Sequence, residues 1–300
     1  MAEQRDVDFV VEGNVTLRAW LFVPDGPGPH AAVTMAHGFA GIREHGLDKF
    51  ARVYAEAGLV VLVHDHRGFG ASGGQPRFDV DPWCQIADWR YAISYLESHP
   101  AVDADRIGLW GSSYAGGHAL VLGATDRRLK AVVAQVPTIS GYEQSLRRVP
   151  PEQVGALEAS FIDDDRRQFA GEPPATQPVV SADRATAAAY HSPDAVTFYN
   201  RPVPDGVVYE NKVTVRSTRA ARMYEPAQFI SRVSPTPLLM IVGLTDTVTL
   251  TDTGLAAYQR ALAPKKLVTI PGGHFDAYNS YFAQTSGAAC DWFLEHLAKE

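Results

Sequence analysis

Short apolar runs rich in β-branched residues alternate along most of the chain with longer segments of helical periodicity. The runs AAVTMA (31–36) and LVVLVH (59–64) contain almost no polar residue. Strands of this composition are buried on both faces, as in a parallel sheet with helices packed against each side. The pattern therefore predicts an α/β fold with a mostly parallel sheet that is covered on both faces.

The predicted strands and helices follow one another in a regular order. We expect strands within the segments 15–24, 31–39, 59–74, 106–111, 129–137, 237–244 and 265–273. We expect helices at 46–57, 81–97, 114–123, 251–262 and 278–299. Strand and helix thus alternate in both halves of the chain, which is the order of a parallel sheet with crossover helices.

The alternation of strands and helices breaks between residues 140 and 227. This stretch contains RRVPPEQ, GEPPATQP and HSPDAVTFYNRPVPDG, and it has no strand-like alternation and no repeat. We expect two or three short helices, joined by proline-rich loops, that cap the carboxyl ends of the strands, where open α/β sheets bind ligands. The predicted domains are an α/β core of residues 1–139 and 228–300 and a cap of residues 140–227. A surface segment without function is the alternative.

Composition and charge narrow the classes of function. A chain of 300 residues is long enough for one large domain with an insertion or for two ordinary domains. A net charge of -7 and a pI of about 5.8 argue against nucleic acid or an anionic membrane as a partner. The N-terminus lacks the basic and apolar regions of a signal peptide, and no apolar run reaches the roughly 20 residues of a membrane span. We therefore expect a soluble, cytoplasmic protein, and the sequence is compatible with a homodimer.

The chain contains two cysteines, Cys84 and Cys290, which lie far apart in predicted helices. Their spacing matches neither a metal site nor a disulfide framework. We expect two free, buried thiols and no metal site built on them.

The segment IGLWGSSYAGGHAL places small residues between a strand-like run and a helix-like run. It fits the G-x-S-x-G nucleophile elbow, in which a serine is held at a strained strand-to-helix turn with its hydroxyl exposed. Gly111 and Ser113 take the first glycine and the serine positions, whereas Ala115 replaces the second glycine and a glycine follows it. Ser112 occupies the variable position and is the competing nucleophile. The spacing predicts Ser113 as the nucleophile.

A serine hydroxyl needs a general base to attack a carbonyl group. His274 follows the last predicted strand in the glycine-rich segment TIPGGHFDAY and comes last, as the order Ser, Asp or Glu, His requires. His118 lies inside the helix after the elbow and is expected to be structural. His64 and His66 form an H-x-H pair, a pattern that can bind zinc, but no further ligand cluster follows them. We predict His274 as the base.

An acidic residue is expected to orient the histidine and to stabilise its charged form. Asp246 lies in GLTDTVTL, directly after the penultimate predicted strand. Asp252 lies at a predicted helix start, where a capping role explains it. Asp276 is only two residues after the predicted base, which is too close for the usual partner. We predict Asp246 as the orienting acid.

Two backbone N–H groups are expected to bind the oxyanion that forms during the reaction. The N–H of Tyr114, the residue after the elbow serine, is directed at this position from a helix N-terminus. The second donor is predicted to be the N–H of Phe39 in AHGFAG, where Gly38 lets the backbone turn inward at a strand end. A tight turn without a catalytic role is the alternative for this segment.

The segment DHRGFGASGG has the glycine content of a phosphate-binding loop but not its pattern. It lacks G-x-G-x-x-G, and no helix opens directly at the loop. We expect a structural turn that Asp65 and Arg67 hold through charge-assisted hydrogen bonds.

Together, the motifs HGF, DHRGFGASGG, GSSYAGG, GLTD and GGHF, in this order, resemble the α/β-hydrolase superfamily. The resemblance covers residues 15–138 and 235–300. Within the superfamily the chain looks most like the branch of dienelactone hydrolases and X-prolyl peptidases, in which G-x-S-Y-x-G elbows and a helical insertion after the sixth strand are usual. The resemblance implies the α/β-hydrolase fold, with a mostly parallel eight-stranded sheet, helices on both faces and no cofactor.

The same resemblance carries a catalytic triad onto Ser113, Asp246 and His274. The branch includes esterases, thioesterases, lactone hydrolases, peptidases and acyl-transferring enzymes of polyketide pathways. A haloalkane dehalogenase is excluded, because its nucleophile is an aspartate where this chain has Ser113. We expect a serine hydrolase that cleaves a carboxylic ester, lactone or thioester of a small-molecule acyl substrate. The alternatives are an acyltransferase, an X-prolyl-type peptidase and a non-enzymatic binding protein on the same fold.

Aromatic, basic and acidic side chains of the insertion are candidates for binding the substrate. Its aromatic residues either line an apolar substrate pocket or form the insertion's own core, which is the expectation for most of Phe161, Phe169, Tyr190, Phe198, Tyr199, Tyr209 and Tyr224. Its arginines either bind a carboxylate or a carrier phosphate or form a solvated face: Arg147, Arg148, Arg216, Arg219 and Arg222. The acidic run 163–165 is either an anchor for a substrate amine or a solvent-facing run.

Overall fold

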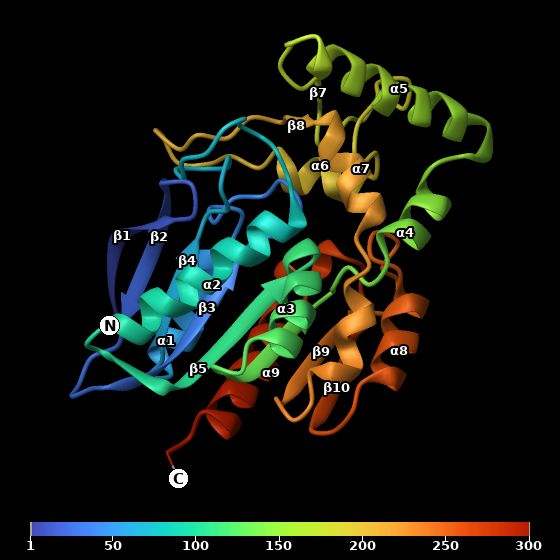
Figure 1. The fold of residues 1–300 in the computed structure, drawn as a ribbon. Coiled ribbons are helices and arrows are strands. Elements are labelled where there is room, and N and C mark those ends of the chain that lie inside the picture. The colour runs from blue at the N-terminus through green and yellow to red at the C-terminus, as the bar shows by residue number, and fades with distance from the viewer. Residues whose placement is uncertain (1, 300) are drawn as a thin grey trace.

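An eight-stranded sheet forms the centre of the computed structural model, which describes residues 2–299 (Figure 1). Its strands lie in the order β1-β2-β4-β3-β5-β6-β9-β10. The first two pairs in this order are antiparallel, and every pair from β4 to β10 is parallel. The strands are β1 (Glu3–Val11), β2 (Val15–Val23), β3 (His30–Ala36), β4 (Val60–His64), β5 (Val102–Ser112), β6 (Leu129–Gln135), β9 (Leu238–Gly243) and β10 (Lys265–Ile270). The predicted mostly parallel α/β sheet is confirmed.

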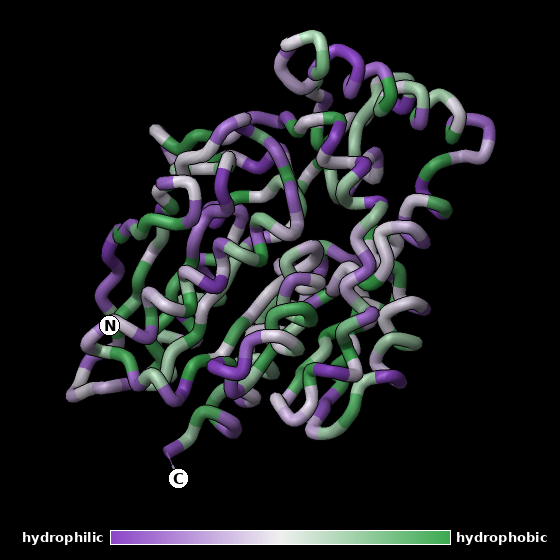
Figure 2. Tube along the Cα trace, in the orientation of Figure 1, coloured by the Kyte–Doolittle hydropathy of each residue, from purple (hydrophilic) through white to green (hydrophobic). Residues whose placement is uncertain are grey.

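Helices cover both faces of this sheet (Figure 1). The helices of the core are α1 (Leu47–Glu56), α2 (Pro82–Ser98), α3 (Tyr114–Thr125), α8 (Thr251–Arg260) and α9 (Phe282–His296). α1 and α9 contact each other on one face, and α2 and α3 contact each other on the opposite face. The central strands between these layers are mostly buried, and in β4 all five residues are buried. Figure 2 shows this as hydrophobic colouring along the central strands.

Local signals in the sequence explain where several helices begin. Asp81 accepts hydrogen bonds from the backbone N–H groups of Trp83 and Cys84 at 2.8 and 3.0 Å, and Pro82 takes the first helical position of α2. Gly46 precedes α1 with φ of 95°, a conformation that favours glycine. These signals account for the agreement between the predicted and observed helix starts.

The edge strand β1 was not among the predicted strands. Most of its residues are exposed, since it pairs only with β2 and only part of one face packs on the core. A strand at the edge of a sheet has a mixed composition, so its apolar alternation over Val7, Phe9 and Val11 is weaker than that of the central strands.

Residues 140–227 form a separate layer above the end of the sheet to which β5 points (Figure 1). The layer contains α4 (Gly141–Arg148), α5 (Pro151–Phe169), α6 (Pro193–Tyr199) and α7 (Val215–Met223), with a short sheet of β7 (Thr176–Gln177) and β8 (Val213–Thr214). The 3-10 helix η1 (Pro226–Arg232) then leads back to β9. The prediction of two or three short helices is therefore wrong in three respects: the described insertion has four helices, α5 has 19 residues, and a two-stranded sheet is present.

The physical reason for the first difference lies at the start of α5. Pro151 occupies the first helical position, where a proline favours a helix rather than breaking it. Only Phe161 and Asp164 of this helix are buried. Most other positions are polar or exposed, and only Val154 and Leu157 add half-buried apolar side chains, so the apolar stripe by which a long helix is recognised is short.

Cys84 and Cys290 are free thiols, as expected, although Cys84 is only partly buried. Among residues 2–299, no helix has both the length and the apolar character needed to cross a membrane.

Candidate active site

The elbow lies between the end of β5 at Ser112 and the start of α3 at Tyr114. Ser113 has φ of 60° and ψ of -120°, which is a strained conformation for a residue with a side chain. The surrounding backbone holds it there: its N–H donates to the carbonyl of Gln135 at 2.9 Å, and its carbonyl accepts from the N–H of Thr138 at 2.9 Å. The strain is thus maintained by the adjacent strand β6 and the segment after it.

Two glycines make the turn sterically feasible. A Cβ atom on Gly111 would lie 2.1 Å from the carbonyl oxygen of Ala115. A Cβ atom on Gly116 would lie 2.8 Å from the Cα atom of Pro137. The close approach between α3 and the end of β6 therefore falls on Gly116, which explains why the motif accepts an alanine at position 115.

The structure brings the three predicted side chains together above the sheet. The Oγ atom of Ser113 lies 2.9 Å from Nε2 of His274, and Nδ1 of His274 lies 2.8 Å from Oδ2 of Asp246. Their exposed fractions are 8% for Ser113, 2% for His274 and 5% for Asp246. The three residues follow β5, β10 and β9, respectively, so the parallel strands deliver them to one edge of the sheet.

Asp246 is tightly held by its own loop. Its Oδ1 accepts from the N–H groups of Val248 and Thr249 at 2.7 and 2.9 Å, and its Oδ2 accepts from the hydroxyl of Thr249 at 2.8 Å. Burial raises the pKa of Asp246, but His274 and these hydrogen bonds oppose it and leave the pKa below its ordinary value. The carboxylate is therefore ionised near neutral pH and faces the imidazole.

The two alternative acids have other partners. Asp252 is exposed on α8 and forms a bidentate ion pair with Arg147 at 2.8 Å. Asp276 accepts from the N–H of Gly273 at 2.8 Å and from the hydroxyl of Ser280 at 3.0 Å. The geometry therefore favours Asp246 over both.

Replacing Asp246 by asparagine is expected to lower kcat by about 10⁴-fold. The amide no longer stabilises a charged imidazole and favours the wrong tautomer of His274, while the shape of the site is kept. Steady-state turnover of a p-nitrophenyl ester measures the loss. Asp252→Asn is the matched control, because a surface ion pair contributes only about 0–1 kcal/mol to stability and its loss leaves the site intact. Equal activity of Asp246→Asn and the control would contradict the assignment.

The other candidate histidines occupy structural positions. In His118, Nδ1 lies 2.8 Å from the hydroxyl of Tyr224 and Nε2 lies 2.9 Å from Oε1 of Gln85. The rings of His64 and His66 are 5.2 Å apart. Within the described part of the chain, no group of three His, Cys, Asp or Glu side chains is arranged to hold a metal. Nothing in this geometry favours the zinc alternative.

The competing nucleophile, Ser112, points away from the histidine. Its Oγ lies 2.5 Å from the hydroxyl of Tyr278 and 3.3 Å from Nε2 of Gln135. Tyr278 ends the 3-10 helix η2 (Phe275–Tyr278), which directly follows His274. Ser112 therefore ties the histidine loop to β5. Sequence reasoning missed Tyr278, since the contact joins residues 166 positions apart.

The segment of the predicted oxyanion donor Phe39 lies directly beside the elbow. A Cβ atom on Gly38 would lie 2.8 Å from Cβ and 3.1 Å from Oγ of Ser113. Tyr114, the other predicted donor, is the first residue of α3, and the first N–H groups of a helix have no partner within the helix. The turn at Gly38 therefore closely approaches Ser113, and the Tyr114 N–H lies at the N-terminus of α3.

The structural turn at DHRGFGASGG has the polar contacts expected for it. Asp65 accepts from the N–H groups of Arg43 and Ala71 at 2.9 and 3.1 Å. Arg67 forms a bidentate ion pair with Asp88 of α2 at 2.5 and 2.6 Å. These bonds fix the loop against α2 and against the segment that follows β3.

Three aromatic residues of the insertion contact the core as well as one another. The ring of Tyr190 lies 6.0 Å from that of Phe39, edge to face. Phe198 and Tyr199 lie 4.6 and 6.3 Å from Phe275, the residue after the histidine. These side chains enclose the site from the insertion side.

Two further aromatic residues of the insertion also contact the core. Tyr209 packs on His45 with ring centroids 4.6 Å apart, and Tyr224 packs on Tyr114 at 5.2 Å. Five of the seven aromatic residues therefore contact the core, and the expectation that most form the insertion's own core is wrong. The physical reason is that the thin insertion has little interior, so its apolar side chains are buried against the core.

Four of the five arginines of the insertion form ion pairs with Asp or Glu side chains, and these ion pairs indicate a structural role for them. The pairs are Arg147 with Asp252, Arg216 with Asp79, Arg219 with Asp165 and Arg222 with Glu158. Arg148 instead stacks on Tyr190 at 4.6 Å and donates to the carbonyl of Val248 at 3.2 Å.

The acidic run 163–165 is likewise engaged. Asp163 pairs with Arg166 and Asp165 with Arg219, while the buried Asp164 accepts from the N–H of Ala175 at 2.7 Å. Because these three carboxylates already have partners within the protein, they are poorly placed to anchor a substrate amine.

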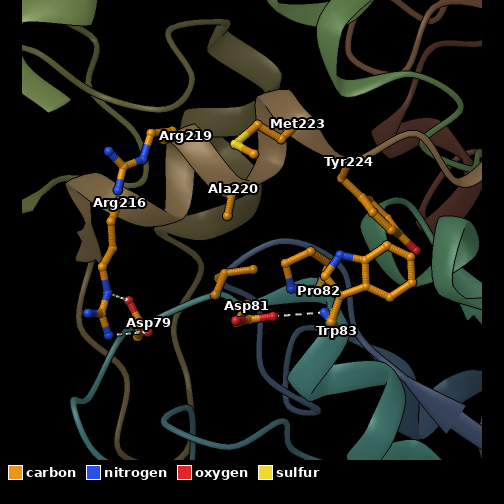
Figure 3. A pocket seen from close by; sticks show the side chains of 10 residues that line it. Asp79, Asp81, Pro82, Trp83, Arg216, Arg219, Ala220, Met223 and Tyr224 are labelled. Atoms are coloured by element: carbon orange, nitrogen blue, oxygen red, sulfur yellow. Dashed lines mark hydrogen bonds and ion pairs between the residues drawn. The ribbon is translucent and has the colours of Figure 1, made fainter. Parts of the chain in front are cut away.

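A cavity of about 440 Å³ opens between α7 and the start of α2 (Figure 3). Trp83 and Met223 on its rim are 55% and 74% exposed, and Arg216 and Asp79 pair at one side of it. Tyr224 separates the cavity from Tyr114, so it lies next to the elbow without including Ser113.

The strand order and the serine elbow between β5 and α3 define the class of this protein: it is an α/β hydrolase. The chain belongs to the X-Pro dipeptidyl-peptidase (S15) family, whose model matches residues 12–276. The resemblance noted in the sequence is thereby confirmed.

Named relatives are diverse in activity. The chain is 32% identical to the quorum-quenching protein AidA of Acinetobacter baumannii, over 92% of this chain and 90% of that protein. It is 29% identical to a thiohydrolase of Eupenicillium brefeldianum, over 92% and 89% of the two chains. The crystal structure of the α/β hydrolase GrgF from Penicillium, elsewhere named a polyketide transferase, superposes with a TM-score of 0.85 at 26% identity, over 99% of this chain and 100% of that one.

Proposed function

We propose that this protein is a serine hydrolase that cleaves a carboxylic ester, lactone or thioester through an acyl-enzyme on Ser113. The observation that carries the proposal is the continuous contact from Ser113 through His274 to Asp246 at a strained elbow. An imidazole between a hydroxyl and an ionised carboxylate is the arrangement that turns an alcohol into a nucleophile.

In the first half of the reaction, Nε2 of His274 takes the proton of Ser113 as Oγ attacks the acyl carbon. Asp246 accepts from Nδ1–H and stabilises the imidazolium. The N–H groups of Phe39 and Tyr114 bind the oxyanion, and each such donor typically contributes 10²–10³-fold in rate. The imidazolium then gives its proton to the leaving alcohol or thiol, which completes the acyl-enzyme.

In the second half, water replaces the leaving group. His274 removes a proton from the water as its oxygen attacks the acyl carbon, and the same two N–H groups bind the second oxyanion. Collapse of this intermediate breaks the bond to Oγ and returns the proton to Ser113. The product is a carboxylic acid.

Acyl transfer to another acceptor is the second candidate. The burial of Ser113 and His274 limits access of bulk water, and GrgF is named a polyketide transferase. A transferase uses the same residues and differs in the acceptor that enters. Product analysis with an added alcohol or thiol separates the two: a new ester or thioester at the expense of the acid indicates transfer.

Labelling with a fluorophosphonate tests the nucleophile. The probe is expected to add once per chain, and peptide mapping is expected to locate it on Ser113. Labelling at another residue, or none under conditions where the protein is folded, would contradict the proposal. Turnover of a panel of an ester, a lactone, a thioester and an aminoacyl amide then identifies the bond type.

A further inference from the structure

Tyr199, at the end of α6 in the insertion, donates a hydrogen bond to the backbone of the core. Its hydroxyl lies 2.7 Å from the carbonyl oxygen of Phe39. Both residues are buried, with exposed fractions of 4% and 3%. The contact joins residues 160 positions apart and reaches the turn that carries the proposed oxyanion donor.

The orientation of the Phe39 N–H depends on the turn from Gly38 to Gly41. The carbonyl of Gly38 accepts from the N–H of Gly41 at 3.2 Å. Because a peptide unit is planar and trans, the Phe39 N–H points opposite to this carbonyl. Ala40, however, has φ of 52°, which a residue with a Cβ adopts only against a cost. The turn therefore needs a second restraint, and Tyr199 supplies one at the next carbonyl.

The ring of Tyr199 is itself held by packing. It lies parallel to the ring of Tyr190, with an interplanar angle of 11° and centroids 6.0 Å apart. Its other neighbours include Phe198, His45 and Phe275 at 5.4, 5.8 and 6.3 Å. A hydroxyl on a ring packed in this way is directed at one acceptor, as pre-organised catalytic sites require.

We propose that Tyr199 is a positioning residue of the oxyanion hole: its hydroxyl holds the carbonyl of the peptide that follows Phe39 and so restrains the turn 38–41, in which the preceding peptide directs the Phe39 N–H at the oxyanion on Ser113. This inference rests on the proposed function. It means that the insertion contributes to the chemical step, and that movement of α6 away from the core loosens the oxyanion hole.

Tyr199→Phe tests the proposal, because it removes only the hydroxyl. We expect kcat to fall about 10- to 100-fold, less than the 10²–10³-fold typical for deletion of a donor, since the N–H stays present but is less well oriented. KM should change less than about twofold, because the interaction acts in the transition state. The matched control is Tyr209→Phe, since the hydroxyl of Tyr209 is also buried in the insertion and has no hydrogen-bond partner among the described residues. The control should retain wild-type kcat.

Two further measurements exclude a merely structural effect. An alkyl boronic acid forms a tetrahedral adduct on the serine and places an oxyanion in the hole, whereas the product carboxylate does not. Tyr199→Phe should weaken boronate binding by the same factor as kcat and leave product binding unchanged. The pH at which the rate falls on the acid side should not move, because the His274–Asp246 pair is untouched.

Wild-type kcat and boronate affinity in Tyr199→Phe would overturn the positioning role, as would equal weakening of boronate and product. A different result would refute the proposed function itself: Ser113→Ala would turn over the substrate as fast as the wild type. Turnover that depends on Ser113 and is indifferent to Tyr199 refutes only the role of Tyr199.

Discussion

Replacing Ser113 by alanine is expected to lower kcat by about 10⁵- to 10⁶-fold. Without Oγ no acyl-enzyme forms, and His274 and Asp246 retain no nucleophile to activate. Triads act as a unit, so the loss of this one atom removes nearly all of their contribution. Residual turnover of about 10³- to 10⁴-fold over water is expected from the oxyanion hole and from substrate binding. Steady-state hydrolysis of a p-nitrophenyl ester by the purified variant measures the loss.

Ser112→Ala is the matched comparison for Ser113→Ala. Ser112 is the neighbouring serine, and its Oγ contacts Tyr278 rather than His274. We expect less than a tenfold loss, because the substitution loosens the link between β5 and the histidine loop without removing the nucleophile. If Ser113→Ala kept activity within tenfold of the wild type and Ser112→Ala did not, the nucleophile would be Ser112.

The convergence of the proposed nucleophile, base and acid was predictable because each lies in a short loop directly after an apolar strand. Ser113, Asp246 and His274 follow β5, β9 and β10, and parallel strands bring their carboxyl ends to one edge of the sheet. Local sequence thus specifies both the identity and the approximate location of these side chains. The arrangement of the strands was expected only from the resemblance to α/β hydrolases, because the hydrophobic periodicity of a strand does not show which strands are its neighbours.

The contacts that sequence analysis missed join distant segments of the chain. Tyr199 reaches Phe39, and Tyr278 reaches Ser112, across 160 and 166 positions. Neither tyrosine belongs to a local motif with a fixed spacing from its partner. The same reason explains the error about the aromatic residues of the insertion, because their burial depends on how the insertion lies against the core.

The core is expected to unfold in mild acid because five histidines are buried in neutral form. Burial holds the pKa of each below its ordinary value of 6.5, to about 3 for His45 and about 4 for His66. The same cause lowers the pKa of His37, His64 and His118 well below 6.5. The unfolded chain therefore binds more protons than the folded one below pH 6.5, and the stability falls as the pH falls through this range.

The size of this effect is comparable with the stability of a whole domain. At pH 5, which is 1.5 units below 6.5, His45 and His66 each lower the free energy of unfolding by about 2 kcal/mol. Two carboxyl groups act in the opposite direction: burial beside Glu44 raises the pKa of Asp65 to about 7, and burial also raises the pKa of Asp88, so the folded chain takes up protons there more readily than the unfolded chain. Five histidines outweigh two carboxyl groups, and the total stability of a domain is typically only about 5–15 kcal/mol. Urea unfolding between pH 7.5 and 4.5 measures the expected loss.

The variant His64→Phe tests whether the buried histidines cause the loss of stability in acid. Neither ring nitrogen of His64 has a hydrogen-bond partner among residues 2–299, and its ring packs against Trp89 at 5.4 Å, so a phenyl ring fits the same environment. We expect the dependence of unfolding free energy on pH between 5 and 6 to decrease by about 1.4 kcal/mol per pH unit, the value for one proton. Val63→Ala, on the same strand, is the control: it lowers the stability at every pH and leaves the slope unchanged. An unchanged slope in His64→Phe would show that the acid sensitivity has another origin.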